Sequence, residues 1–204
     1  MDAPSTPSAE PLVRARSCQD WLALIALEEE PYRTRFFERL TDGLRTQIEG
    51  ASRVAWLPLV VHVKLADILL DAFGTVRAYD YYRRALASAV KGPLFGPLFR
   101  TGSRVLGLSP ASFVRWGSRA YDVSFRHAGA VAGEVLGPGR ACLRYLDLPP
   151  VCTASDAWMT SAQGFTYGVY DVLGVDGVVR LDTSARGEGK MVLELEWSDR
   201  KRGS

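Results

Sequence analysis

The segment that most constrains the fold of this chain runs over residues 129–197, where two alternating apolar patterns flank a helical one. Residues 130–136 and 141–148 alternate apolar and polar side chains on either side of a Gly-Pro-Gly-Arg sequence at 137–140. Glycine and proline favour a tight reversal of the chain between two strands. We therefore predict a β-hairpin over these residues.

A helix and a second hairpin are predicted to follow. Ser155 suits a helix N-cap, apolar residues recur at near-helical spacing up to Val172, and Gly174 suits the left-handed residue after a helix. Residues 178–182 and 191–197 alternate around a glycine-rich turn, which indicates a second strand pair in the same sheet.

The N-terminal half has the pattern of several amphipathic helices. One is predicted to begin at Trp56-Leu57-Pro58 and to end at Gly74, and another to open at Ser109-Pro110 and to run up to Gly129. Residues 94–106 are apolar but interrupted by glycine and proline, which indicates a short or irregular helix. The predicted fold class is α+β, with N-terminal helices packed on an antiparallel sheet that the hairpin-helix-hairpin half forms.

Composition and length indicate a disordered tail at residues 1–14 and a single α+β domain at residues 15–204. The chain has 204 residues, of which 47% are hydrophobic and 24% charged, with a net charge of +2. Scattered charges of nearly equal number argue against nucleic-acid binding. Neither a signal peptide nor an apolar stretch long enough to span a membrane is present, so a cytoplasmic protein is expected.

Motifs for catalysis and for metal binding are missing from the sequence. Cys18, Cys142 and Cys152 lie far apart, without the paired spacing of zinc or thiol-exchange sites. No glycine-rich phosphate loop follows a predicted strand, and no nucleophilic residue lies within a known motif. We therefore predict a non-enzymatic protein without a cofactor or metal.

The order of these elements resembles an uncharacterised paralogous family of myxobacteria. The resemblance rests on the Trp56-Leu57-Pro58 segment, the turn at 137–140, the glycines at 164 and 168, and a last strand that ends in Trp197. The layout is also similar to that of the haem nitric-oxide/oxygen-binding domains and of the 4-vinyl-reductase-like sensory domains. This resemblance implies a sensory module that encloses a small molecule between helices and sheet.

The resemblance to haem domains can be compared residue by residue. Those domains use a histidine on a helix before the sheet and a Tyr-x-Ser-x-Arg strand that holds the haem propionates. His127 and Tyr145 match, but Asp147 replaces the serine and Pro149 the arginine. An anion and a ring without donors are poor partners for carboxylates, so we expect no bound haem.

The candidate ligand-binding residues are mainly aromatic, with an arginine at one side, as is common in small-molecule pockets. They are Trp56, Tyr79, Tyr82, Arg83, Phe95 and His127. The tyrosines have core packing as their alternative role, and His127 has capping of a helix C-terminus. His62, on the apolar helix, is expected to be a core residue.

Two functional hypotheses lead from the sequence, and an enzyme whose site no sequence pattern reveals is a third alternative. The first is a non-enzymatic module that binds a small, apolar molecule and acts in signalling or regulation. The second is an interaction module that forms a homodimer or docks onto a protein partner through an apolar patch or a strand edge. A cavity lined by the tyrosines would favour the first, and a filled core with a surface patch the second.

Overall fold

A computed structural model describes residues 9–92, 96–97, 101 and 109–199 of the chain. In the N-terminal half the elements are β1 (Leu12–Arg14), α1 (Ala15–Ile25), α2 (Tyr32–Arg39), α3 (Asp42–Glu49), β2 (Trp56–Pro58), α4 (Leu59–Ala89) and α6 (Pro110–Ser124). There follow β3 (Phe125–Arg126), β4 (Ala130–Gly137), β5 (Arg140–Leu146), α7 (Pro150–Thr153), α8 (Asp156–Leu173), β6 (Val175–Asp182), a 3-10 turn (Arg186–Glu188) and β7 (Met191–Asp199).

The C-terminal half forms a four-stranded sheet in the order β4-β5-β7-β6. All neighbouring strands are antiparallel, with Val131 opposite Tyr145, Leu143 opposite Leu193, and Val179 opposite Leu195. Both predicted hairpins and their union in one sheet are thus confirmed, as is the α+β fold class.

Among the described elements, helices cover one face of this sheet. Residues opposite one another on its inner face, such as Leu143 and Leu193, are almost completely buried. The outer face carries charged side chains that pair across strands, including Arg180 with Glu196 at 3.1 Å and Arg144 with Glu134. This division into an apolar and a charged face is the pattern expected of an antiparallel sheet with one side in water.

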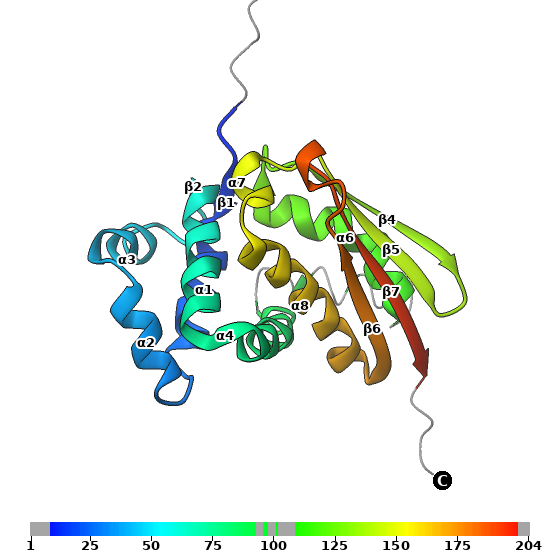
Figure 1. Ribbon diagram of the computed structural model, residues 1–204, viewed down its shortest axis with the longest axis horizontal. Coiled ribbons are helices and arrows are strands. Elements are labelled where there is room, and N and C mark those ends of the chain that lie inside the picture. Colours follow the sequence, from blue (N-terminus) through cyan, green and yellow to red (C-terminus); the bar gives the residue numbers. More distant parts are fainter. Residues whose placement is uncertain (1–8, 93–95, 98–100, 102–108, 200–204) are drawn as a thin grey trace, which may run out of the picture.

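The helices form further layers on the inner face, as Figure 1 shows, with α8 between the sheet and α4 and with α2 and α3 at the far side. Glycines allow α8 and α4 to approach closely. A Cβ atom on Gly168 would lie 2.5 Å from the Arg83 carbonyl oxygen, and one on Gly164 would lie 2.8 Å from the Tyr82 Cβ. Their missing side chains therefore set the distance between the two helices.

The caps of α8 and the start of α6 agree with the sequence-based expectation. The Ser155 hydroxyl accepts a hydrogen bond from the Trp158 amide at 3.0 Å, and Gly174 is left-handed with φ 67°. The Ser109 hydroxyl accepts from the Ser112 amide at the start of α6. However, α6 ends at Ser124 instead of reaching Gly129, because residues 125–126 turn extended and pair with β1.

Two further expectations are corrected by a small three-stranded sheet, ordered β2-β1-β3. Trp56–Pro58 is a strand and not the first turn of a helix, because its backbone pairs with β1 and α4 starts only at Leu59. Strand β1 also lies inside the predicted disordered tail. Its Val13 has no exposed surface, and burial of that side chain together with strand pairing holds residues 12–14 in place.

Helix α4 contains the predicted interruption at Gly74, where φ is 72° and ψ is 165°. Glycine adopts this backbone conformation without the steric clash that a Cβ atom would cause. Two helical segments therefore meet at an angle within α4. None of the helices in the described ranges is sufficiently long and apolar to cross a membrane. The irregular helix predicted over residues 94–106 falls almost entirely outside the described residues.

Candidate functional site

A cavity of about 360 Å³ lies between the helical layers and the inner face of the large sheet. Its walls come from α1, both halves of α4, α6, α8 and the strands β4 and β5. This volume is within the range of small-molecule sites in proteins, about 300–1,000 Å³. The cavity is therefore large enough to enclose a small ligand.

Small side chains on three helices leave this space. Ala85 on α4, Ala120 on α6 and Ala162 on α8 all line it. Around them stand large rings, among them Trp21. Larger residues at these positions would fill the space, so the cavity follows from the placement of alanine on these helices.

His62 is the most distinctive polar residue of the cavity wall. It lies on α4, is 5% exposed, and its ring centre is 4.4 Å from that of Trp21 and 5.6 Å from that of Phe125. Its Nδ1 atom is buried and has no hydrogen-bond partner in the part of the chain that the structure describes. Burial lowers the pKa of His62 to about 4, so its imidazole is neutral at neutral pH.

A second polar atom without a partner belongs to the same cavity. The hydroxyl oxygen of Ser17, on α1, is buried and makes no hydrogen bond. By contrast, the Tyr121 hydroxyl donates to the Ala128 carbonyl at 2.7 Å. Burial raises the pKa of Tyr145 on β5 to about 12, partly offset by a hydrogen bond to Thr166. The cavity thus has a mainly apolar lining, and two of its lining residues, Ser17 and His62, carry a buried polar atom without a partner among the described residues.

The cavity reaches the protein surface beside α1. Leu27, which follows this helix, lines it and is 81% exposed, and Asp20 is exposed as well. Arg16 also lines this end and pairs with Asp20 at 3.3 Å, while Asp20 pairs with Arg53 at 2.5 Å. Arg16 and Arg53 therefore share the single carboxylate of Asp20 near the opening.

The tyrosines that were predicted to surround a cavity instead pack into the protein interior along α4. Tyr82 has no exposed surface, packs 5.3 Å from the Trp21 ring and has the Ala66 carbonyl as its hydrogen-bond acceptor at 3.5 Å. Neighbouring Tyr81 is equally buried and donates to the Trp21 carbonyl at 2.9 Å. Neither is among the described residues that line the cavity.

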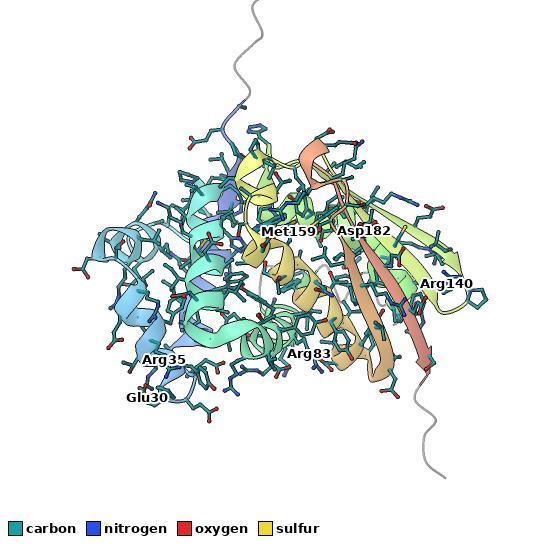
Figure 2. All side chains as sticks on the ribbon, in the orientation of Figure 1. Glu30, Arg35, Arg83, Arg140, Met159 and Asp182 are labelled. Atoms are coloured by element: carbon teal, nitrogen blue, oxygen red, sulfur yellow. The ribbon has the colours of Figure 1, made fainter. Side chains whose placement is uncertain are left out.

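Tyr79 and Arg83 lie where α4 meets α8, and Figure 2 shows Arg83 at this contact. The Arg83 guanidinium donates two hydrogen bonds of 2.9 Å to the Asp171 carboxylate and lies 4.5 Å from the Tyr167 ring centre. Tyr79 packs edge-on against the same Tyr167 ring at 5.9 Å. These residues join two helices and do not line the described part of the cavity wall.

The remaining predicted site residues lie away from the cavity or outside the described part of the chain. Trp56 is on β2 of the small sheet. His127 follows β3 with a positive φ of 51° and donates from Nδ1 to the Glu10 carbonyl at 3.2 Å. It is exposed and does not cap a helix C-terminus, because α6 has ended three residues before it. Phe95 is outside the described residues.

Haem, which the family resemblance implies, can be tested against the residues of this cavity. His62 offers an imidazole, but a haem also needs cationic or donor partners for its two carboxylates. Arg16 is the lone cation among the described lining residues, and it is bound to Asp20. Asp147 is exposed, and neither it nor Pro149 lines the cavity. The residues present do not fit haem.

No protein-family model matches this sequence, and no curated protein is significantly similar to it. The fold is nevertheless similar to solved structures of H-NOX proteins. An unliganded Fe(II) H-NOX protein from K. algicida superposes with a TM-score of 0.62 at 9% identity, covering 94% of this chain and 100% of that one. The Fe(II)NO form of an H-NOX protein from S. oneidensis gives 0.62 at 9% identity, covering 91% and 99%.

A third structure extends the same comparison. An oxygen-binding H-NOX domain related to soluble guanylate cyclases has a TM-score of 0.60 at 7% identity, with 92% of this chain and 95% of that one covered. Similarity at so low an identity shows the fold and not the ligand or the activity. The chain therefore has an H-NOX-like fold.

Proposed function

We infer that this protein is a non-enzymatic module that binds a small, mainly apolar molecule in the cavity between its helices and sheet and acts in sensing or regulation. The observation that carries this proposal is the neutral His62 imidazole, buried beside an open space with its Nδ1 atom unpaired. Unpaired buried polar atoms are uncommon in proteins, because each one loses its hydrogen bond to water. A ligand with one polar group would supply the missing partner once the imidazole turns its Nδ1 atom toward the cavity.

The chemistry of the lining determines the class of ligand. Aromatic and aliphatic side chains of α1, α6 and α8 favour an apolar body, and the neutral state of His62 favours an uncharged polar group. The likeness to H-NOX proteins supports a sensory role, because the solved structures of those proteins include a nitric oxide complex and an oxygen complex. Regulation by ligand binding is therefore the role that this fold and cavity support best.

Two measurements test the proposal. Native mass spectrometry of protein purified from its own host would detect a small molecule retained at one copy per chain. Calorimetric titration with 2-naphthol, a bicyclic probe with one hydroxyl, would measure binding in the emptied protein. We expect Ala120→Leu, which places a larger side chain in the cavity, to weaken binding of the probe about tenfold or more.

The control uses the same substitution on the same helix. Ala111 lies on α6 but is not a lining residue, so Ala111→Leu should bind the probe as the unmodified protein does. Equal affinity of both variants would show that the probe binds elsewhere. That result, together with no retained molecule in the mass spectrum, would contradict the proposed function.

A further inference from the structure

The outer face of the small sheet β2-β1-β3 brings together two arginines and a tryptophan. Along β1, Val13 is completely buried, so Arg14, the next residue, points to the opposite face. Arg14 lies opposite Trp56 of β2, and Arg126 of β3 lies opposite Leu12 on the same face as Arg14. The guanidinium carbons of Arg14 and Arg126 are 3.8 Å and 4.2 Å from the Trp56 ring centre.

This Arg14–Trp56–Arg126 cluster carries positive charge that no described carboxylate neutralises. Arg14 donates one hydrogen bond, from Nη1 to the Val54 carbonyl at 2.7 Å, and Arg126 forms no hydrogen bond or ion pair with a described residue. Most other arginines in the described ranges pair with an aspartate or a glutamate, as Arg83 and Arg180 do. Burial and the charge of Arg126 lower the pKa of Arg14.

A second arginine-tryptophan pair in the molecule shows what is unusual here. On α6, Arg119 lies 4.8 Å from the ring centre of Trp116, an ordinary cation–π contact with a single charge. In the small sheet, two guanidinium groups approach one ring, and their like charges repel each other. An anion bound between or beside them would relieve this repulsion. It would also accept hydrogen bonds from their free N–H groups.

We propose that the Arg14–Trp56–Arg126 cluster binds the phosphate group of a small phosphomonoester. A phosphomonoester carries nearly two negative charges at neutral pH, which matches two guanidinium groups, whereas a carboxylate would neutralise only one. Arginine presents N–H groups in a planar fork that fits phosphate oxygens in pairs. None of the three residues lines the cavity, so this site is separate from that of the proposed apolar ligand.

The test uses phenyl phosphate as the probe, with calorimetry and phosphorus NMR at low ionic strength. The full chain should bind the probe at a single saturable site. Arg126→Gln should weaken binding about tenfold or more, because it removes one of two charge-assisted contacts. Arg119→Gln, which removes the arginine of the single-charge pair, is the matched control and should leave the affinity unchanged.

Further ligands and one further variant test whether the phosphate group is what the cluster recognises. Benzoate should bind at least about tenfold more weakly than phenyl phosphate if charge matching is correct. Inorganic phosphate should compete with phenyl phosphate if the phosphate group is what is recognised. Arg14→Gln also removes the hydrogen bond to Val54, so circular dichroism must show that it folds, and Arg126→Gln decides the question if it does not. Equal affinity in Arg126→Gln and Arg119→Gln, equal binding of benzoate, or no saturable binding would each overturn the proposal.

Discussion

Tyr82 and His62 both lie on α4 and both pack against Trp21, but their surroundings differ. Their ring centres are 5.3 Å and 4.4 Å from that of Trp21. The Tyr82 hydroxyl has a backbone acceptor, as does that of Tyr81, whereas Nδ1 of His62 has none. The surroundings of Tyr82 are a filled core with its hydroxyl satisfied, whereas His62 lines the cavity and has a polar atom left unpaired.

The difference between Tyr82 and His62 concerns hydrogen bonding and not burial. His62 at 5% and Tyr82 at 0% exposure are both core residues by accessibility alone. A buried polar group with a protein partner stabilises the fold, whereas one without a partner is a cost that a ligand or an ordered water can remove. The unpaired atom beside an open space is therefore the better indicator of a site than a cluster of buried aromatic rings.

Removal of the Tyr82 ring should produce the largest effect on stability. Tyr82→Ala leaves a void in the filled core, and we expect a loss of about 3–5 kcal/mol in the free energy of unfolding, measured by chemical denaturation. Tyr79→Ala is the matched control on the same helix. Because Tyr79 is only partly buried, its removal should cost less, and equal losses would show that the Tyr82 side is not a filled core.

His62 should make stability depend on pH in a predictable direction. Its pKa is lowered from an ordinary value of 6.5 to about 4, so below 6.5 the unfolded chain binds a proton that the folded chain does not. The contribution of His62 to the free energy of unfolding is therefore fully present above pH 6.5. It decreases by about 3 kcal/mol as the pH falls towards about 4. Denaturation at several pH values should show this loss.

Replacement of His62 isolates its contribution from that of the carboxylates. His62→Phe should make the decrease in stability between neutral pH and about pH 4 smaller by about 3 kcal/mol. If His62→Phe keeps the pH profile of the unmodified protein, the imidazole is not buried as the structure places it.

The sequence predicted the large sheet because its signals are local. Each hairpin joins strands that are neighbours in the chain, with alternating side chains and a glycine-rich turn between them. The small sheet has no such signal. Its strands are two or three residues long and come from residues 12–14, 56–58 and 125–126, and Pro58 suits a helix start as well as a strand end.

The cavity was harder to predict, because it depends on which residues face one another across several elements. Helical spacing placed Tyr79 and Tyr82 on one face, but Tyr82 meets Trp21 and Tyr79 meets Tyr167. His62 was expected to be an ordinary core residue. A polar side chain on an apolar helix face was the available signal, and only the folded structure shows that His62 lines a cavity together with residues of other helices.

Haem should leave the protein unchanged, which is the smallest effect expected. The described lining of the cavity offers the His62 imidazole but no free cation, since Arg16 is paired with Asp20. Two propionates enclosed there without partners would lose their hydration and gain little in return. We therefore expect no sharp Soret band when haem is added to the purified protein. Absorbance titrations of His62→Ala and His127→Ala provide the comparison. A stoichiometric band that His62→Ala abolishes would make His62 an axial ligand and contradict this account. A weak, broad band that both variants retain would reflect adsorption at the surface.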